Sequence, residues 1–267
     1  MKFRKICEQD RIIFKNLHNT VFLDDPVSED QFNRWIIQDG FLGLFENENI
    51  IGFLHMVIEN NYSHLAKIAV SPEHQGRGLG RKLMEKALEY FKEKSCKGIT
   101  LYVLFDNTKA INLYKKYNFE VKFESFHYII NNSYFKNMFE NDADLVFRMV
   151  KSEDIPHLVE RFPLANKDEL EMYLKRENSY SLLLISNNEI LAYGRYDPHY
   201  SGCKPFYLSD KNHLELFLAK VSRYQPDDKD YIRIVFDNHQ ELAEYCHDQG
   251  YELFDHLLKM YHEIQIE

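Results

Sequence analysis

The sequence has few cysteines and no long apolar runs. Its four cysteines are scattered over 267 residues, without the close pairs of a zinc site or a disulfide framework. No apolar run approaches the length that crosses a bilayer, and the N-terminal segment turns polar before a signal-peptide core can form. The twelve histidines form neither His-Glu-x-x-His nor a Cys/His quartet at ligand spacing. We therefore expect a cytoplasmic protein with no bound metal and no membrane contact.

Glycine is also scarce, and three of the ten glycines lie within residues 75–80. They stand between an apolar, strand-like run at 65–70 and a segment with apolar residues at helical spacing. Residues without side chains let successive backbone N–H groups converge on an anion, and a helix start adds unpaired donors and a positive dipole end. The order of strand, glycine loop and helix therefore predicts a diphosphate site. A glycine-rich turn without a ligand is the alternative.

Two common phosphate loops do not fit this segment. A Walker loop ends in Gly-Lys-Ser or Gly-Lys-Thr, whereas Gly80 is followed by Arg81. A dinucleotide fingerprint needs Gly-x-Gly-x-x-Gly, and here the third glycine comes one position early. The pattern present is Gln-x-x-Gly-x-Gly, and at this point the chain resembles the GNAT superfamily of acyl-CoA-dependent N-acyltransferases. In that family the loop wraps the CoA pyrophosphate, so the resemblance implies acetyl-CoA as cosubstrate.

A second segment carries the same resemblance. Residues 98–105 are strand-like, and residues 106–107 can cap a helix from 108 to about 117. The family's spacing Asn-x-x-Ala-x-x-x-Tyr-x-x-x-Gly-Phe is matched by Asn107, Ala110, Tyr114 and Phe119. Asn118 replaces the glycine of that pattern. Because asparagine is the second choice for a left-handed helix cap, we expect the same geometry there.

The upstream elements complete one domain. A strand is predicted at residues 2–6, helices at about 10–21 and 28–38, and two strands around the turn at 47–49. The resemblance implies an α+β (three-layer α/β) fold, a mixed, mostly antiparallel twisted sheet flanked by helices, over residues 1–140.

The second half of the chain resembles a degenerate copy of the first. Residues 232–238 echo 101–107, and a tyrosine follows each asparagine after seven residues, Tyr245 matching Tyr114. We infer a tandem duplication with a second GNAT-like domain at 141–267. Residues 141–144 are the predicted linker, and the pair Asn131-Asn132 is predicted to turn a hairpin.

The second copy has no glycine at residues 207–214, where its phosphate loop would lie. Side chains there would block close backbone approach, and Asp210 would repel a diphosphate. We therefore predict that the second domain does not bind CoA, and that Asn238 and Tyr245 are structural relics.

Charge divides unequally between the two halves. Residues 1–140 carry 19 basic and 18 acidic residues, and the remainder carries 14 and 24. An acidic second half argues against nucleic-acid binding, which needs a basic face. It is compatible with attraction of a cationic amine towards a site between the domains; solubility alone is the other explanation.

The resemblance implies attack of a neutral primary amine on the acetyl-CoA thioester. In the family the strand before the loop splays from its neighbour and pairs with pantetheine, a role that falls to Ile68 and Val70, and a backbone N–H of that strand stabilises the oxyanion. Tyr114 would protonate the departing thiolate, or be a core aromatic. Asn107 either bonds the pantetheine arm or caps its helix. The predicted cofactor-binding residues are Ile68, Ala69, Val70, Gln75, Gly76, Arg77, Gly78, Leu79, Gly80, Arg81, Asn107 and Tyr114.

A base must take a proton from the ammonium form of the acceptor. Many relatives use a glutamate six residues before the valine that ends the strand, and the same count from Val70 reaches His64. Histidine titrates near neutrality and could act directly or through a water, or His64 could be a surface residue. His55 and Glu59 are weaker substitutes.

The prediction is an acetyl-CoA-dependent N-acetyltransferase that works by direct attack in a ternary complex. The second domain is expected to shape or cover the acceptor site. Asp24 and Asp25, in the loop where such enzymes contact acceptors, favour a polyamine, an aminoglycoside or a lysine side chain. The alternatives are a non-catalytic acyl-CoA sensor and a protein N-terminal or lysine acetylase. A monomer (an intramolecular pseudo-dimer) or a homodimer is expected.

Overall fold

A computed structural model of the chain describes residues 1–23, 25–59, 62–136 and 145–264. It divides into two compact units, one of Met1–Lys122 with Leu258–Glu267 and the other of Phe123–Leu257. This division differs from the predicted ranges 1–140 and 141–267, because the segment that begins at Phe123 belongs to the second unit and the segment that begins at Leu258 belongs to the first. The predicted linker at 141–144 lies outside the described residues.

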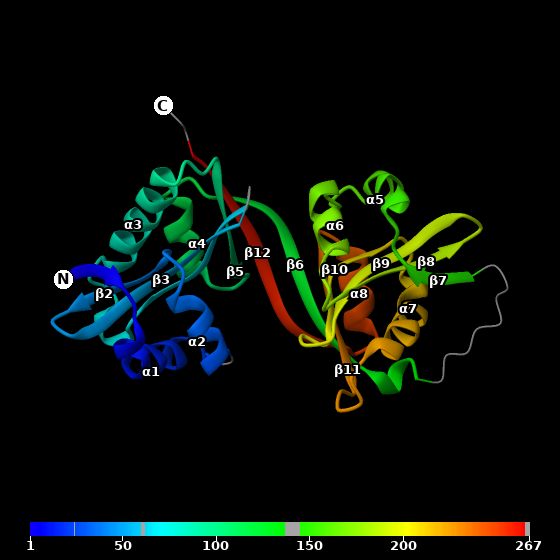
Figure 1. The fold of residues 1–267 in the computed structure, drawn as a ribbon, viewed down its shortest axis with the longest axis horizontal. Helices are drawn as coiled ribbons and strands as arrows, with labels where there is room; N and C mark the ends of the chain where they lie inside the picture. Colours follow the sequence, from blue (N-terminus) through cyan, green and yellow to red (C-terminus); the bar gives the residue numbers. More distant parts are fainter. Residues whose placement is uncertain (24, 60–61, 137–144, 265–267) are drawn as a thin grey trace. The chain divides into compact units, whose positions relative to one another are not determined.

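The first half of the chain supplies six strands and four helices within the described residues (Figure 1). The strands are β1 (Lys2–Lys5), β2 (Phe41–Glu46), β3 (Asn49–Glu59), β4 (Tyr62–Val70), β5 (Gly98–Leu104) and β6 (Glu120–Asn131). The helices are α1 (Arg11–Val21), α2 (Glu29–Ile36), α3 (Leu79–Glu93) and α4 (Thr108–Lys115). Each predicted element is present with bounds shifted by a few residues at most.

The second half repeats this order of strands and helices. Its strands are β7 (Leu145–Met149), β8 (Tyr180–Ser186), β9 (Glu189–Asp197), β10 (Gly202–Leu208), β11 (Tyr231–Asp237) and β12 (Glu252–Glu263). Its helices are α5 (Ile155–Arg161), α6 (Lys167–Leu174), α7 (Leu214–Val221) and α8 (Gln240–Asp248). In both halves the sheet is mixed, with antiparallel pairs except for β4 with β5 and β10 with β11. The predicted α+β class is confirmed.

The last strands of the two halves are exchanged. The strand order in the first unit is β1-β2-β3-β4-β5-β12, and in the second it is β6-β11-β10-β9-β8-β7. β6 pairs antiparallel with β11 from Ser125 to Asn131. The predicted hairpin at Asn131-Asn132 is therefore wrong, because Asn132 begins a 3₁₀ turn and the next described strand, β7, pairs with β8 rather than with β6.

Helices cover both faces of the first unit's sheet (Figure 1). α1 and α2 bury one aromatic-rich cluster that includes Phe14, Phe32 and Phe53. α3 and α4 bury the other, which includes Leu83 and also contains β12 side chains. Successive β-strand residues point to opposite faces, so one strand serves both clusters: Ile68 and Val70 of β4 pack on the α3 side and Ala69 on the α1 side.

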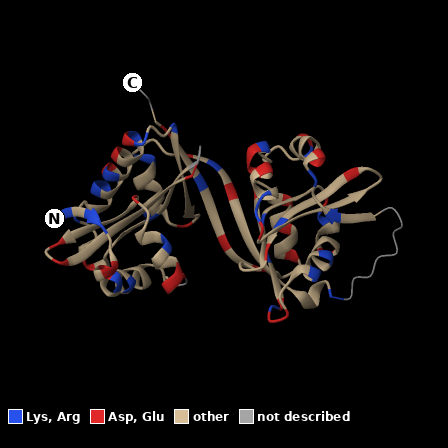
Figure 2. Cartoon of the chain, in the orientation of Figure 1, with Lys and Arg blue, Asp and Glu red and all other residues tan. Residues whose placement is uncertain are grey.

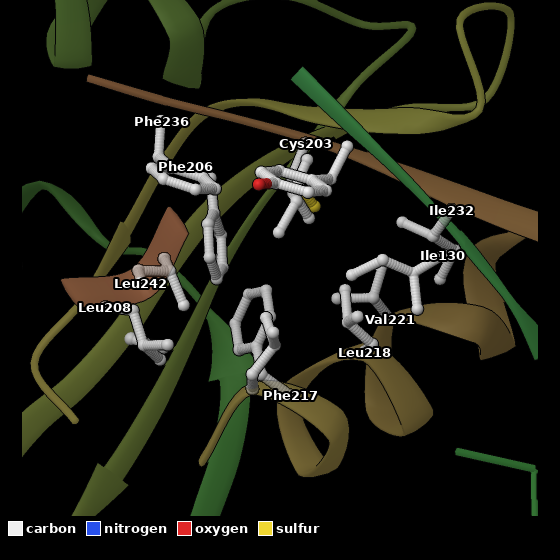
Figure 3. Packing of buried hydrophobic residues seen from close by; sticks show 14 of the residues in the cluster. Ile130, Cys203, Phe206, Leu208, Phe217, Leu218, Val221, Ile232, Phe236 and Leu242 are labelled. Atoms are coloured by element: carbon white, nitrogen blue, oxygen red, sulfur yellow. The ribbon is translucent and has the colours of Figure 1, made fainter. Parts of the chain in front are cut away.

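The second unit has its own core. Side chains of β10, β11, α7, α8 and β6 point towards one another in Figure 3, among them Phe206, Phe217 and Phe236. Phe217 is fully buried and its ring lies 5.5 Å from that of Phe206. This cluster is as completely buried as those of the first unit, so the second copy has kept a full core.

Candidate active site

β4 and β5 run parallel, and within the described residues they pair at one register position, His64 with Thr100. Both residues lie near the start of their strands. Beyond them the strands separate, which leaves one edge of β4 without a partner strand as far as Val70. This matches the predicted splay.

The main-chain groups of β4 that face this opening follow from its ladder with β3. Ser71 N–H donates to Ile51 O at 2.9 Å, so the next pair along, Val70 with Gly52, is a non-hydrogen-bonded pair. The same alternation applies to Ile68 with Leu54. The N–H and C=O groups of Ile68 and Val70 therefore point away from β3, where an extended ligand could pair with them.

The glycine loop follows β4 and leads directly into α3. Gly76 and Gly78 both have a φ of 77°, a left-handed conformation that side-chain-bearing residues rarely adopt. A Cβ built on either glycine would meet no protein atom within 4 Å. Close packing therefore does not explain these glycines; they leave open space over the start of α3, where the main-chain hydrogen bonds to Gly78 O come from the amides of Arg81 and Lys82.

The Gln75 side chain bridges this loop to α4. Its Nε2 donates to Val70 O at 3.3 Å, and its Oε1 accepts from Lys109 Nζ at 2.6 Å. The carbonyl of Val70 thus already accepts a hydrogen bond from Gln75, and the Lys109 ammonium is held beside the glycine loop.

An open cleft of about 650 Å³ lies between the end of β4, the loop and α4. Its lining residues are Val21, Ile68, Ala69, Val70, Gln75, Gly76, Gly78, Leu79, Gly80, Arg81, Asn107, Lys109, Ala110, Asn112, Leu113, Tyr114 and Lys116. Three of these are basic and none is acidic. The cleft therefore presents cationic side chains and unpaired amides to the same space.

Most of the predicted cofactor-binding residues meet in this cleft. Arg77 does not line it; it is exposed between the two glycines. His64 also lies outside the lining, at the start of β4. The sequence did not lead us to Lys109, Asn112 and Leu113 of α4 or to Lys116 at its C-cap. Their spacing of three, one and three residues places them on one helical face and could have identified them.

Tyr114 lies on α4 with 6% of its surface exposed, and its ring is 6.0 Å from that of Phe119. Burial raises the pKa of Tyr114 to about 12, so its hydroxyl stays protonated at neutral pH. Tyr114 is both a core aromatic and a cleft residue. A packing role and a role as proton donor, the two alternatives predicted for it, are therefore compatible.

Asn107 has the capping role that was one of its two predicted functions. Its Oδ1 accepts from Ala110 N–H at 3.1 Å, which closes the first turn of α4, and its surface lines the cleft. At the other end of α4, Asn118 has a φ of 59° and thus the left-handed conformation predicted for it.

His64 is half-buried, and its Nδ1 lies 3.1 Å from Thr100 Oγ1. His55 is 4% exposed and bonds Gln38 Oε1 through Nε2. Burial and the nearby charge of Lys67 lower the pKa of His55 to about 4. A nitrogen of such low basicity is a poor base at neutral pH, which leaves His64 as the better candidate of the two.

The acceptor loop is less acidic than the sequence predicts. Asp25 accepts a hydrogen bond from Lys67 Nζ at 2.6 Å, and the same ammonium lies 4.3 Å from the centre of the Phe22 ring. Asp24 lies outside the described residues. At least one of the two carboxylates is therefore neutralised by β4 rather than offered to a cationic acceptor.

The corresponding region of the second unit is built differently. Asp210 Oδ1 accepts from Asn212 N–H, and a 3₁₀ turn of side-chain-bearing residues leads into α7. Tyr245, the counterpart of Tyr114, donates to the buried Glu215 at 3.0 Å. Asn238 does not cap α8, because His239 Nδ1 accepts from Leu242 N–H in its place.

In the described part of the chain, no group of three or more His, Cys, Asp or Glu side chains could hold a metal ion. No helix there has both the length and the apolarity needed to cross a membrane.

Comparisons with known proteins agree with this geometry. Residues 10–119 match the acetyltransferase (GNAT) family model. Spermidine N(1)-acetyltransferase of Vibrio cholerae serotype O1 is 36% identical over 90 residues, an alignment that spans 32% of this chain and about half, 48%, of that enzyme.

Two solved structures resemble the whole chain. A GCN5-related N-acetyltransferase from Sphaerobacter thermophilus has a TM-score of 0.72 at 13% identity and covers 99% of this chain and 96% of its own. A tandem GNAT protein from the clavulanic acid biosynthesis pathway has a TM-score of 0.64 at 12% identity and covers 100% and 99%. Residues 10–119 thus resemble GNAT acetyltransferases in sequence, and the whole chain resembles a tandem GNAT protein in fold.

Proposed function

We propose that this protein is an acetyl-CoA-dependent N-acetyltransferase whose first unit moves an acetyl group to a primary amine in a ternary complex. The observation that carries the proposal is the pair of left-handed glycines, Gly76 and Gly78, with open space above them at the start of α3. A helix start with free amides and nearby cations suits a diphosphate.

The residues of the cleft fit coenzyme A along its length. The amides of residues 76–80 would hold the diphosphate, with Arg81 and Lys109 supplying positive charge. The outward N–H and C=O of Ile68 and the N–H of Val70 would pair with the pantetheine arm. When bound, acetyl-CoA supplies the activated acetyl group as a thioester.

Three groups of this chain then serve the transfer. His64 accepts a proton from the ammonium of the acceptor, directly or through a water, which makes the amine a nucleophile. The N–H of Ile68 or Val70 donates to the thioester oxygen as charge develops there, a contribution of a few kcal/mol. As the C–N bond forms and the C–S bond breaks, Tyr114 donates its proton to the sulfur and recovers one from the new amide nitrogen.

The acceptor class is a primary amine, either a small molecule or a peptide. Because Asp25 is already paired with Lys67, its carboxylate gives little reason to prefer a polycation over a singly charged amine. Three of the four cysteines are buried and all four are free thiols, which suits a reducing compartment, and we propose the cytoplasm.

The test is calorimetry of CoA binding to the full chain. Gly78→Ala places a methyl group in the proposed diphosphate space and should weaken binding by at least about tenfold. Gly250→Ala is the matched control, because Gly250 in the second unit has a φ of 74° and the same open surroundings. It introduces equal backbone strain without touching the cleft. Equal CoA affinity of the two variants would contradict the proposal.

A non-catalytic CoA-binding module is the second candidate, favoured by the absence of His64 from the cleft lining. An amine panel assayed for release of the CoA thiol separates the two. Tight CoA binding with no thiol release from any amine would establish the binding module instead.

A further inference from the structure

The point where β4 and β5 join is held by side chains as well as by main chain. His64 and Thr100 are register partners, and His64 Nδ1 lies 3.1 Å from Thr100 Oγ1. Thr100 Oγ1 also lies 3.0 Å from Ser63 O, the carbonyl of the residue before His64. Three groups are thus linked in a row at the point where the two strands begin to separate.

The row has one consistent arrangement of protons. A carbonyl oxygen carries no proton, so the Thr100 hydroxyl must donate its single proton to Ser63 O. The Thr100 oxygen is then an acceptor, and the contact to His64 is a hydrogen bond only when Nδ1 carries a proton. The lone pair of the neutral ring consequently resides on Nε2.

We propose that Thr100 is a positioning residue that holds His64 in the Nδ1–H tautomer, so that Nε2 is the atom that takes the proton of the acceptor ammonium. This inference rests on the proposed function, in which His64 is the base. During the step a proton moves from the ammonium nitrogen to Nε2, the Nδ1–H···Thr100 bond remains, and the imidazolium later releases the Nε2 proton to water.

The surroundings of the ring include several titratable groups. Tyr102 on β5 lies edge-on, with ring centres 5.9 Å apart. His55 on β3 and Lys67 on β4 share one face of the sheet as register partners, and the charge of His64 acts on His55. Burial lowers the pKa of His55 to about 4, so at neutral pH it adds no charge. Lys67 is paired with Asp25, and Lys259 on β12 lies 5.9 Å from the centre of the Tyr102 ring.

The first experiment reads the tautomer without any need for activity. The full chain with ¹⁵N-labelled histidine is studied by long-range ¹H–¹⁵N correlation NMR above the titration range, and His64→Gln identifies the His64 signals. The wild type and Thr100→Ser should show the Nδ1–H pattern, because serine keeps the hydroxyl. Thr100→Val should show Nε2–H or a mixture. A wild type with the proton on Nε2, or an unchanged pattern in Thr100→Val, would overturn the proposal.

The second experiment tests the consequence for catalysis. Thr100→Val should lower kcat by about tenfold at neutral pH, shift the acidic limb of the kcat profile and leave the KM for acetyl-CoA unchanged, while Thr100→Ser restores the wild-type profile. Thr20→Val is the control, since Thr20 also donates one hydroxyl hydrogen bond, to Asn16 O in α1, but lies on an exposed helix surface.

The possible outcomes distinguish a failure of the role of Thr100 from a failure of the proposed function. A changed tautomer with an unchanged pH profile would show that Thr100 sets the tautomer without affecting transfer, which overturns its positioning role in the reaction. No transfer to any amine by the wild type would overturn the proposed function, while the NMR result would still decide what sets the tautomer. Thermal unfolding of each variant identifies any loss of kcat that comes from a loss of fold.

Discussion

The two units share a scaffold but differ at the place where chemistry would occur. In the first, Arg4 forms a bidentate pair with Asp10 through contacts of 2.6 and 2.8 Å. In the second, Arg148 pairs with Asp154 in the same way, at 2.7 Å for both contacts. The sequence separation is the same, and in both units one carboxylate oxygen also accepts a backbone N–H three residues upstream. This structural device has survived duplication in both copies.

Backbone irregularities are shared as well. The β2–β3 pair changes register after Leu44, and the β8–β9 pair does so after Leu184. The bulge leaves one extra residue on β3 and on β9, and both lie next to a hairpin turn. Asn118, shortly after the end of α4, and Gly250, shortly after the end of α8, are both left-handed. Elements that shape the sheet and its helices were therefore retained.

The difference is concentrated at the third helix and its tyrosine. The first unit has left-handed glycines before α3, and its Tyr114 lines the cleft. Burial alone raises the pKa of Tyr114. In the second unit, burial together with the hydrogen bond to Glu215 raises the pKa of Tyr245 to about 12. Tyr251 donates to the same carboxylate. A tyrosine hydrogen-bonded to a buried carboxylate serves packing, so we propose that the second unit has kept the fold but not the site.

The distribution of acidic residues distinguishes the two units less clearly than the local structure at their third helices does. Figure 2 shows acidic residues of the second unit spread over several elements, α6 among them, rather than gathered at one place. A spread of this kind fits solvated surface better than a patch that attracts an amine. The open space above Gly78 and the hydrogen bonds of Glu215 distinguish the two copies more clearly.

The largest expected effect comes from cutting the chain between the copies. The first unit needs the segment that contains β12, because Leu258 and Met260 of this strand and the following Ile264 lie in its core and are at most 9% exposed. Burial of three such side chains contributes about 5–9 kcal/mol, comparable to the whole stability of a domain. Residues 1–140 alone should therefore be largely unfolded by far-UV circular dichroism and should not bind CoA in calorimetry.

A peptide of residues 252–264 added to the fragment is the control, and it should restore helicity. A fragment of residues 1–140 that folds and binds CoA by itself would show that β6 can occupy the position of β12, and that the exchange of strands is not needed for the site.

The next effect compares the two tyrosines. Tyr114→Phe should lower kcat by about 100-fold and leave the CoA affinity unchanged, because the phenyl ring keeps the packing but has no proton to donate. Tyr245→Phe should leave kcat unchanged and reduce the free energy of unfolding by about 1–2 kcal/mol, because the buried Glu215 loses one donor. Kinetics and urea unfolding on both variants test this; the reverse pattern would assign the chemistry to the second unit.

The arginine–aspartate pairs give an intermediate effect on stability. The hydrogen bond from Arg4 lowers the pKa of Asp10, and that from Arg148 lowers the pKa of Asp154. A carboxyl with a lowered folded-state pKa stabilises the fold above its ordinary pKa of about 4, and this contribution is lost as the pH falls through the folded-state value.

Asp10→Asn and Asp154→Asn should each cost about 2 kcal/mol of unfolding free energy at pH 7. The loss should shrink as the pH falls below about 4. Urea unfolding at both pH values is the measurement. A loss confined to one copy would mean that the two pairs are no longer equivalent.

The smallest expected effect concerns the cation beside the loop. Counting from the paired tyrosines, Lys109 corresponds to Gln240, so Lys109→Gln installs the second copy's residue. It removes one positive charge and the bond to Gln75, and CoA affinity should fall by about fivefold, with a shallower dependence on salt. Lys115→Gln on the same helix is the control, because Lys115 is exposed and does not line the cleft. Equal losses in both variants would point to net charge rather than to the position of Lys109.

The sequence by itself determined what depends on neighbouring residues. The periodic segments, the cap at Asn107, the left-handed Asn118 and the glycine loop before α3 are all encoded within a few positions. The repeat of strands and helices followed from matching such local patterns in the two halves. These features are set by backbone conformation and helix geometry, and they need no distant partner.

Only the tertiary structure decided what depends on residues far apart in the chain. Gly98 looks unremarkable in the sequence, yet a Cβ there would lie 2.2 Å from the hydroxyl of Tyr261 on β12. The pairing of Asp25 with Lys67 and of Tyr245 with Glu215, and the exchange of β6 and β12, likewise join segments that no local pattern connects. Burial and partner identity set these contacts, and both arise only when the whole chain has packed.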